Sequence, residues 1–152
     1  MERTFVILKP DAVQRGLTGT IIQRIEQKGL KIIAMKLLTI TIEQAEKQYE
    51  CHKGKPFYPS LIAFMTSGPS VAMILEGRNA VAIFRKFIGS TDPVQSEPGT
   101  IRGDFSIDVK HNLIHASDCE ISFKHESSIY FSDEEIQKYK LSLKGWLYYE
   151  GK

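Results

Sequence analysis

Runs of β-branched and aliphatic residues alternate along this chain with segments that carry helix-start signals. The first run, residues 4–8, is an apolar stretch that we expect to form a buried strand. Pro10 ends this strand, because proline cannot donate to a strand ladder. Further runs lie at residues 30–40 and 71–75, and a shorter, weaker one at 112–114. A chain with this alternation has to bury a sheet beneath helices.

Capping residues mark where the intervening helices are expected to begin. The expected starts are Thr18, Thr41, Pro59, Asn79, Ser117 and Ser132. Thr41, Ser117 and Ser132 are each followed three residues later by Gln or Glu, which is the spacing of a capping box. Gly29 is expected to close the first of these helices, because glycine accepts the left-handed conformation found at helix C-termini.

Helices that separate strands are typical of α/β units, with right-handed crossovers where neighbouring strands are parallel. Four strands in two βαβ-like halves indicate the split βαβ, ferredoxin-like arrangement. The expected fold is of the α/β (α+β) class, a four-stranded antiparallel sheet with helices covering it. Because 152 residues is the length of one domain, we expect residues 1–152 to form a single domain.

Residues 89–108 are rich in Pro and Gly and offer no clear helix or strand. Loops of this length inside compact domains are usually functional or disordered. The segment carries Thr91, Arg102 and Asp104, whose side chains can bind ligands. We therefore expect a functional loop.

Composition excludes several classes of protein. The net charge is only +2, from 20 Lys and Arg against 18 Asp and Glu, which is too little for a nucleic-acid binder that relies on bulk electrostatics. Cys51 and Cys119 form neither a disulfide framework nor a zinc spacing with the four His. The first residues lack the apolar core of a signal peptide, and no apolar run is long enough to span a membrane. We expect a soluble cytoplasmic protein with no membrane and no specific nucleic-acid partner.

Neither the G-x-x-x-x-G-K-[ST] phosphate loop nor G-x-G-x-x-G occurs in the sequence. A phosphate-handling protein without them must use side chains, for which Lys9, Arg85, Thr91 and Arg102 are candidates. Arginine can hold phosphate oxygens with two parallel hydrogen bonds, whereas lysine supplies a compact charge. Any one of these arginines, taken alone, is more often a solvated or ion-paired side chain.

His115 stands at the end of the short apolar run, two residues before the expected helix start at Ser117. A side chain in that place faces free N–H donors, which favour anions. A neutral imidazole is a competent nucleophile if one ring nitrogen is free and the other is held. The alternative, a packed His bonded to a carbonyl, stays open from this stretch alone. Metal ligation with His111 is less favoured, because both residues lie in a strand-like run.

The segment at residues 112–118, NLIHASD, matches the N-x-x-H-[GA]-S-D signature of nucleoside diphosphate kinases. The chain also resembles that family through ERTFVILKPDAVQRGLTGTIIQRIEQKGLKI, KPFYPSLIAFMTSGPSVAMILEG, PGTIRGDFS and the Trp-containing C-terminal tail. These segments cover nearly the whole chain in the family's order and spacing. The resemblance implies a ferredoxin-like fold, Mg²⁺ as the metal, and homo-oligomers that are commonly hexamers, with tetramers and dimers in some bacteria.

The resemblance also implies roles for individual residues. His115 is expected to be the nucleophile that takes the γ-phosphoryl of a nucleoside triphosphate and passes it to a nucleoside diphosphate, in a ping-pong mechanism through a phosphohistidine. Ser117 and Glu126 match the pair that orients this histidine, although the sequence leaves open whether Glu126 reaches it. Residues expected to bind phosphates and sugar hydroxyls are Lys9, Tyr49, Arg85, Thr91, Arg102 and Asn112.

Phe57 falls where the family stacks the nucleotide base, with Leu61 nearby. No group that could read a base edge is evident around Phe57, so broad base specificity is expected. No protein ligand set for the metal is expected either, because Mg²⁺ tends to bind through substrate phosphates and to keep waters.

Two positions depart from the commoner family pattern. Position 116 is Ala instead of Gly, and position 119 is Cys where a small Ser, Gly or Ala is usual. Neither change removes a reacting group. Two other functions are compatible with such a pocket: a nucleotide-binding regulatory protein that has lost turnover, and a phosphotransferase that acts on protein side chains. The first is expected to have lost the His or a phosphate-binding cation, and this chain keeps them.

Overall fold

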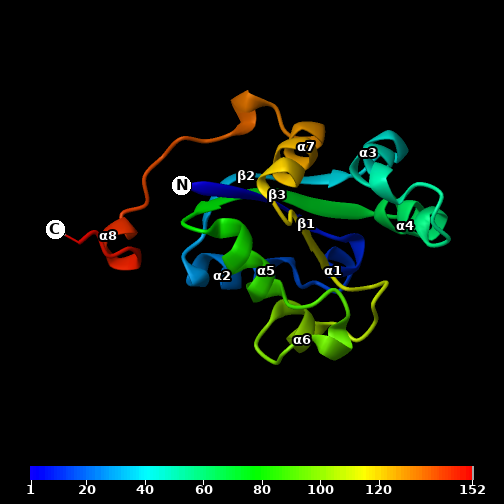
Figure 1. Cartoon of the computed structure of the whole chain (residues 1–152), viewed down its shortest axis with the longest axis horizontal. Coiled ribbons are helices and arrows are strands. Elements are labelled where there is room, and N and C mark those ends of the chain that lie inside the picture. The colour runs from blue at the N-terminus through cyan, green and yellow to red at the C-terminus, as the bar shows by residue number, and fades with distance from the viewer. Residues whose placement is uncertain (152) are drawn as a thin grey trace.

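The computed structural model describes residues 1–151 and contains a four-stranded sheet in the order β2-β3-β1-β4 (Figure 1). The strands are β1 Glu2–Leu8, β2 Lys31–Thr39, β3 Pro69–Gly77 and β4 Ile114–Ala116. Every neighbouring pair is antiparallel, and β3 lies between the sequential strands β1 and β2. The predicted α+β class and four-stranded antiparallel sheet are confirmed.

Helices cover both faces of this sheet. In chain order the helices are α1 Pro10–Gln14, α2 Thr18–Lys28, α3 Ile42–Gln48, η1 Glu50–His52, α4 Tyr58–Met65, α5 Ala80–Ile88, η2 Pro93–Gln95, α6 Ile101–Phe105, α7 Glu120–Tyr130, η3 Asp133–Glu135 and α8 Lys144–Leu147. Figure 1 shows α7 and α3 on one side of the sheet and α1, α2 and α5 on the other. No helix among residues 1–151 is both long enough and apolar enough to cross a membrane.

Two apolar cores result, one on each face. Val6 and Leu8 of β1 pack with α2 and α5, and we call this the α2–α5 core. Phe5 and Ile7 point the opposite way and pack with α3, α4 and α7 in the α3–α7 core. A strand alternates its side chains between faces, so a strand covered on both sides has to be apolar throughout. That requirement explains the uninterrupted apolar run at the start of the chain.

The predicted capping box at Ser117 is wrong. Helix α7 begins at Glu120, and its N-cap is Cys119, whose sulfur accepts from the Ser122 amide at 3.5 Å while the Ser122 hydroxyl bonds the Cys119 amide at 3.0 Å. Ser117 is instead fully buried and its amide donates to Phe5 O of β1 at 2.9 Å, which extends the strand pairing. The fourth strand lies two residues later than predicted, so His115 lies inside β4 and not at a helix entrance.

Other predicted boundaries need smaller corrections. The N-cap of α2 is Leu17, not Thr18, whereas Gly29 closes that helix at φ +90° as expected. Asn79 is the N-cap of α5, but with a left-handed backbone (φ +52°) and no side-chain hydrogen bond. The capping box at Ser132 starts only one 3₁₀ turn, η3, and not a full helix. Helix α4 begins one residue before Pro59.

The sequence offered no clear helix or strand at residues 89–108, but the structure has helical turns there. It contains the 3₁₀ turn η2 and the short helix α6, where Thr100 caps the first turn through the Gly103 amide. Both elements are only 3–5 residues long, which is too short for apolar periodicity to reveal them. The five-residue helix α1 was missed for the same reason.

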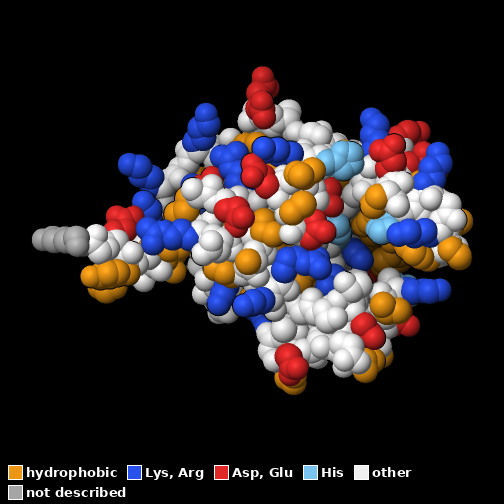
Figure 2. Space-filling view, viewed as in Figure 1, with side chains coloured by type: hydrophobic (Ala, Val, Ile, Leu, Met, Phe, Trp, Pro, Cys, Tyr) orange, Lys and Arg blue, Asp and Glu red, His pale blue; other side chains and the backbone are white. Residues whose placement is uncertain are grey.

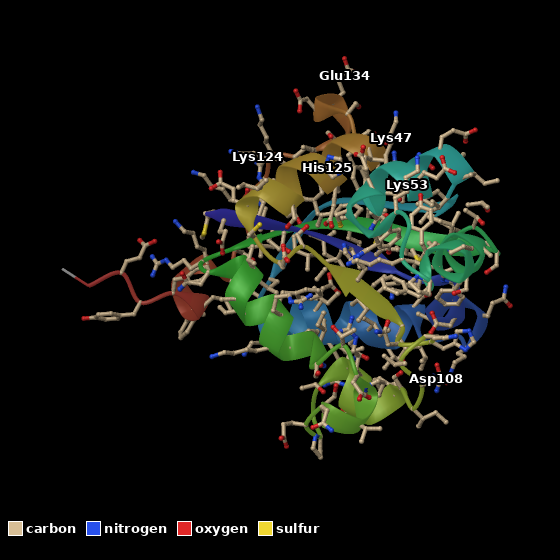
Figure 3. All side chains as sticks on the ribbon, turned by 45° about the vertical axis from the view of Figure 1, so that its right-hand side comes forward. Lys47, Lys53, Asp108, Lys124, His125 and Glu134 are labelled. Carbon is tan, nitrogen blue, oxygen red and sulfur yellow. The ribbon has the colours of Figure 1, made fainter. Side chains whose placement is uncertain are left out.

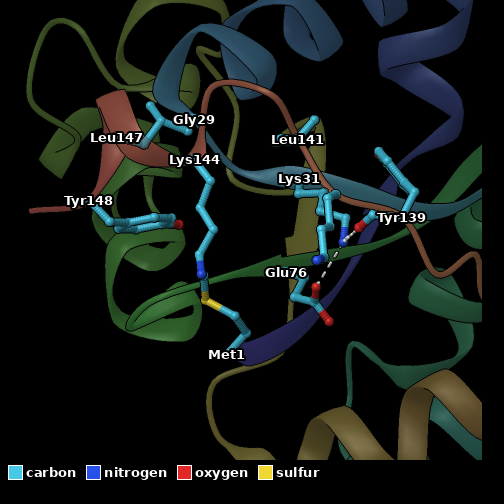
Figure 4. A pocket seen from close by; sticks show the side chains of 10 residues that line it. Met1, Gly29, Lys31, Glu76, Tyr139, Leu141, Lys144, Leu147 and Tyr148 are labelled. Atoms are coloured by element: carbon cyan, nitrogen blue, oxygen red, sulfur yellow. Dashed lines mark hydrogen bonds and ion pairs between the residues drawn. The ribbon is translucent and has the colours of Figure 1, made fainter. Parts of the chain in front are cut away.

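Residues after η3 run back along the edge of the sheet to α8. A cavity of about 190 Å³ lies between this tail and the sheet, lined by Met1, Lys31, Glu76 and tail residues (Figure 4). Within it, Lys31 Nζ donates to Glu76 Oε1 at 3.1 Å. None of the expected nucleotide-site residues lines this cavity.

Candidate functional site

His115 is the middle residue of β4, opposite Ile7 of β1, and its side chain is 21% exposed. Its ring lies near two aromatic rings of the α3–α7 core. The ring centroid is 6.0 Å from that of Tyr49, edge to face at 80°, and 6.5 Å from that of Phe5. The imidazole therefore packs against two aromatic rings and remains partly exposed to solvent.

A buried carboxylate holds one nitrogen of this imidazole. Glu126 lies in the middle of α7, and its Oε1 is 2.9 Å from His115 Nε2. The Ser117 hydroxyl donates to the other carboxylate oxygen, Oε2, at 2.6 Å. A carboxylate only accepts, so Nε2 must carry the proton and Nδ1 must present its lone pair in the neutral ring. Nδ1 makes no hydrogen bond to any residue in 1–151.

Tyr49 places a hydroxyl-bearing ring beside the His115 imidazole. It is the C-cap of α3, its side chain is buried, and its hydroxyl has no hydrogen-bond partner within the described chain. Burial raises the pKa of the Tyr49 hydroxyl, and the nearby Tyr130 and Glu126 raise it further. The hydroxyl therefore keeps its proton and is a free donor. A buried unpaired donor is costly unless a ligand completes it.

Lys9 and Asn112 meet at the end of β1. Lys9 Nζ donates to Asn112 Oδ1 at 2.7 Å, and Asn112 Nδ2 donates to the Thr91 carbonyl at 3.0 Å. Burial, and to a smaller extent the charge of Arg102, lower the pKa of Lys9 to about 8, while the charge of Asp11 opposes the change. Lys9 therefore still carries its charge at neutral pH.

Arg102 was expected to bind phosphate, but in this structure its guanidinium binds backbone. It is buried and donates to the carbonyl oxygens of Ile114 at 2.6 Å, Gly89 at 3.1 Å and Asn112 at 3.2 Å. These bonds tie the segment at residues 89–108 to β4. Burial lowers the pKa of Arg102 to about 10, and the charge of Arg85 contributes.

Arg85 is less tied. It lies in the last turn of α5, and its only hydrogen bond among the described residues is a long one, 3.4 Å, to the Ala116 carbonyl. Its charge also helps to lower the pKa of Asp118 on the loop after β4. The carbonyl that it contacts belongs to the residue after His115, so the cation lies beside the imidazole segment.

Phe57 lies at the open end of a series of rings that starts at His115. It is 44% exposed, whereas Leu61 on α4 is partly buried against the α3–α7 core. His52 lies between Phe57 and Tyr49, with ring centroids 5.4 and 6.3 Å away. Figure 2 shows a recess between the parts of the molecule that hold α4 and α6, with His and cationic side chains at its inner end.

His52, which was not among the residues predicted to form the site, is partly buried and lies next to the aromatic series. Lys55 Nζ is 3.1 Å from His52 Nδ1 and 5.8 Å from the Phe57 ring centroid. Burial lowers the pKa of His52, and Lys55 and His115 lower it further. His52 is therefore neutral at pH 7. Its position three residues after Tyr49 is the sequence signal that could have identified it.

Helix α7, which carries Glu126, is fixed to α3, which leads into Tyr49. The two helices lie side by side, and His125 Nε2 donates to the Lys47 carbonyl at 2.9 Å (Figure 3). On the inner side, the Tyr130 hydroxyl donates to Gln48 Oε1 at 2.5 Å. These bonds set the height of Glu126 relative to the imidazole.

Comparison with known proteins assigns the arrangement to a family. The model of the nucleoside diphosphate kinase family matches residues 2–136. The chain belongs to the nucleoside diphosphate kinase family. It is 52% identical to the nucleoside diphosphate kinase of Archaeoglobus fulgidus over 150 residues, which cover 99% of both chains. It is 57% identical to that of Kosmotoga olearia over 143 residues, 94% of this chain and 97% of that protein.

Solved structures agree with this membership. The chain superposes on the nucleoside diphosphate kinase of Halobacterium salinarum, solved in complex with CDP, with a TM-score of 0.95 at 45% identity, over 97% of this chain and 99% of that one. The corresponding family protein of Babesia bovis gives a TM-score of 0.94 at 43% identity, with 97% and 100% coverage. The enzyme therefore has nucleoside diphosphate kinase activity, a phosphotransferase reaction between nucleotides.

Proposed function

We propose that Nδ1 of His115 carries the phosphoryl group between a nucleoside triphosphate and a nucleoside diphosphate. In the first step the Nδ1 lone pair attacks the γ-phosphorus, an N–P bond forms, and the bond to the β–γ bridging oxygen breaks as the diphosphate leaves. In the second step a terminal oxygen of another diphosphate attacks the phosphohistidine in line, and the N–P electrons return to Nδ1. One observation carries this proposal: Glu126 holds Nε2 and leaves Nδ1 free.

Neighbouring groups would supply most of the catalysis through position and charge. Phosphorylation makes the imidazole cationic, and the Glu126 carboxylate on Nε2–H stabilises that charge. The unpaired Tyr49 hydroxyl and the Lys9 ammonium can donate to phosphate oxygens near His115. Arg85, Thr91, Asn112 and Arg102 are proposed to bind phosphates and sugar hydroxyls; for Arg102 this requires that at least one of its carbonyl bonds be exchanged.

The base is proposed to stack on Phe57, with Leu61 beside it. The exposed Phe57 face accepts any base, because every base has a π-face. The two polar neighbours, Lys55 and His52, are exposed and half-buried, whereas strong discrimination between bases requires buried groups aimed at the base edge. The relative from Halobacterium salinarum binds CDP, and we propose that this chain accepts pyrimidine and purine nucleotides alike.

Mg²⁺, which the family generally uses, fits the donors present only as a substrate-held ion. Among residues 1–151 no group of three or more His, Cys, Asp or Glu side chains could hold a metal. Asp118 is exposed, and the hydroxyl of Ser122, which donates to it at 2.7 Å, lowers the pKa of Asp118 and keeps it ionised. Asp118 would contact the ion through water. The ion would neutralise phosphate charge while the phosphate oxygens supply most of its ligands.

Three further expectations belong to the proposal. The enzyme is proposed to be a homohexamer, with a tetramer or dimer as the alternative, to work in the cytoplasm, and to comprise one domain over residues 1–152. Light scattering after size-exclusion chromatography measures the assembly directly. A single cooperative unfolding transition is expected for one domain.

The test of the proposed function is the assay with ATP and GDP. The enzyme should make GTP in stoichiometric amounts, whereas a regulatory nucleotide binder makes none and a protein phosphotransferase consumes ATP without making GTP. His115→Ala should lower the rate by about 10⁶-fold, the size seen when a covalent nucleophile is removed. The matched control is His125→Gln, which keeps a donor for the Lys47 carbonyl and should retain the wild-type rate. GTP formation by His115→Ala at the wild-type rate would overturn the assignment.

A further inference from the structure

The backbone turns sharply two residues before His115. Leu113 has φ +73°, and it is one of only two non-glycine residues with positive φ in the described chain. Leucine rarely adopts this left-handed conformation, which persists only where the surrounding structure over-determines it. Leu113 is also fully buried, so its side chain is fixed as well.

This turn changes the alternation of side chains just before the strand that carries the imidazole. Leu113 and Ile114 both pack in the α2–α5 core although they are consecutive, whereas His115 lies against Phe5 and Tyr49 on the other face. In a regular strand, residues two apart share a face, so Leu113 and His115 would lie on the same side. Pairing with Ile7 of β1 puts His115 on the α3–α7 face, and the left-handed residue breaks the alternation before it, so that Leu113 packs on the opposite face.

One carboxylate holds the turn. Asp11, in the first turn of α1, accepts the Leu113 amide on Oδ2 at 3.1 Å, while the Leu113 carbonyl accepts the Lys9 amide at 2.9 Å. The second oxygen, Oδ1, is buried and has no partner within residues 1–151. A buried carboxylate oxygen without a partner is unfavourable by itself. The unpaired oxygen of Asp11 is therefore an unfavourable feature that lies where the strand of His115 begins.

We propose that Asp11 is a positioning residue that holds the Leu113 amide in its left-handed turn and so places both the His115 imidazole and the Lys9 ammonium. The proposal rests on the proposed role of His115. Asp11 does not reach the reacting atoms; it acts through the backbone of β4. Its negative charge has a second effect, because it raises the pKa of Lys9 against the lowering by burial and by Arg102.

The test compares Asp11→Ala, which removes the hydrogen bond, with Asp11→Asn, which keeps an acceptor oxygen for the Leu113 amide. Asp108→Ala is the matched control, because Asp108 also accepts a backbone amide, that of Lys110 at 2.7 Å, on the exposed loop before β4. Two quantities are measured at pH 6.5, where Lys9 is charged. They are the single-turnover rate of phosphohistidine formation from Mg-ATP and the side-chain NMR resonances of His115, with His125 as internal reference.

Asp11→Ala should phosphorylate about 10²-fold more slowly, the effect of a misplacement of about 1 Å, and should shift the His115 resonances but not those of His125. Asp11→Asn should stay within about threefold of wild type, as should Asp108→Ala, since neither loses the bond to Leu113. If Asp11→Ala does not fold, Asp11→Asn decides: an unshifted His115 and a near-wild-type rate support the proposal, and a 10²-fold loss overturns it.

Wild-type His115 resonances and a near-wild-type rate in folded Asp11→Ala would also overturn the proposal. A failure of the proposed function is distinguishable from this result. If His115→Ala still made GTP, the His115 resonances in the Asp11 variants would still show whether Asp11 places the imidazole.

Discussion

The two ends of the aromatic series that runs from His115 to Phe57 are built differently. At the His115 end, a ring that is 21% exposed is held by a carboxylate that a buried serine fixes in turn. At the other end, Phe57 is 44% exposed, and the side chains of its polar neighbours His52 and Lys55 hydrogen-bond only each other within residues 1–151. Under the proposed function, the site fixes the reacting nitrogen closely and the base loosely. Changes at the first end should therefore alter the rate of chemistry, and changes at the second should alter binding of all nucleotides together.

The largest effect after loss of His115 itself should come from Glu126→Gln. The Ser117 hydroxyl donates to Oε2 in the wild type, so it should draw the amide oxygen of Gln and turn the amide NH₂ toward Nε2. Nε2 would then have to accept, and the proton would move to Nδ1, the nitrogen that must attack. Placing the wrong tautomer costs about 10⁴-fold in a serine protease, and we expect kcat to fall by about 10³-fold or more.

The double variant Glu126→Gln with Ser117→Ala sharpens this prediction. Without the serine hydroxyl the amide is free to turn its oxygen to Nε2, so part of the lost kcat should return. Steady-state kinetics with ATP and GDP measure both variants. A Glu126→Gln enzyme with wild-type kcat would show that the tautomer is not set by this residue.

Arg102 tests whether the region around His115 is held by the long segment that joins α5 to β4. Arg102→Ala removes three hydrogen bonds to carbonyls, of which only that of Asn112 keeps another donor, the Ile114 amide, and we expect the free energy of unfolding to fall by about 3 kcal/mol. Arg102→Lys should restore little, because a compact ammonium cannot reach three separate carbonyls. Thermal unfolding measures the loss, and the matched control Arg15→Ala, which removes one exposed bond to the Phe105 carbonyl, should change stability by less than about 1 kcal/mol.

Lys9 gives the same region a pH dependence. Its pKa of about 8 lies below the ordinary value of 10.5, so the ammonium is present below pH 8 and is lost above it. We expect kcat/KM to fall by about tenfold per pH unit above pH 8 if the charge is required. The stability contribution runs the other way: between pH 8 and 10.5 the unfolded chain binds more protons at this residue, so its contribution to stability rises with pH. A flat profile of kcat/KM up to pH 10 would contradict a role for the Lys9 charge.

The smallest effect should come from the base end. Phe57→Ala should weaken kcat/KM by roughly tenfold for adenine, guanine, uracil and cytosine diphosphates alike, since stacking contributes about 1–3 kcal/mol per base. The ratios among the four substrates should change by less than about threefold. A preference above about 10⁴ for one base in the wild type would mean that His52, Lys55 or another group reads the base edge.

The fold was predictable from sequence because burial on both faces leaves a local mark. Residues 5–8 of β1 are all apolar and buried, and the capping box at Thr41 forms as its spacing indicates. The same spacing at Ser117 gave a wrong prediction, because the hydroxyl of a buried serine can also hydrogen-bond a side chain that only the fold brings near. Ser117 takes Glu126 as its partner, and only the packing of α7 on β1 brings the two together.

The sequence selected residues that the structure brings close together, but it did not predict how they are arranged. The signature around His115 and the family resemblance selected the residues that the structure gathers, such as Lys9 and Asn112, which are 103 positions apart and 2.7 Å from each other. No local pattern predicts the left-handed backbone of Leu113 or the three carbonyl bonds of Arg102. Those features depend on how α1, α6 and β4 are placed against one another, and short elements carry no periodic signal for that placement.

In the proposed mechanism Glu126 holds Nε2 of His115 and leaves Nδ1 to react. The direct measurement is heteronuclear ³¹P and ¹⁵N NMR of the enzyme after incubation with Mg-ATP and no acceptor, with intact mass giving the number of phosphoryl groups. We predict one phosphoryl group per chain, stable to alkali and lost in acid, with phosphorus bonded to Nδ1 of His115. Phosphorus on Nε2, or on any residue other than His115, would contradict the assignment of the nucleophile.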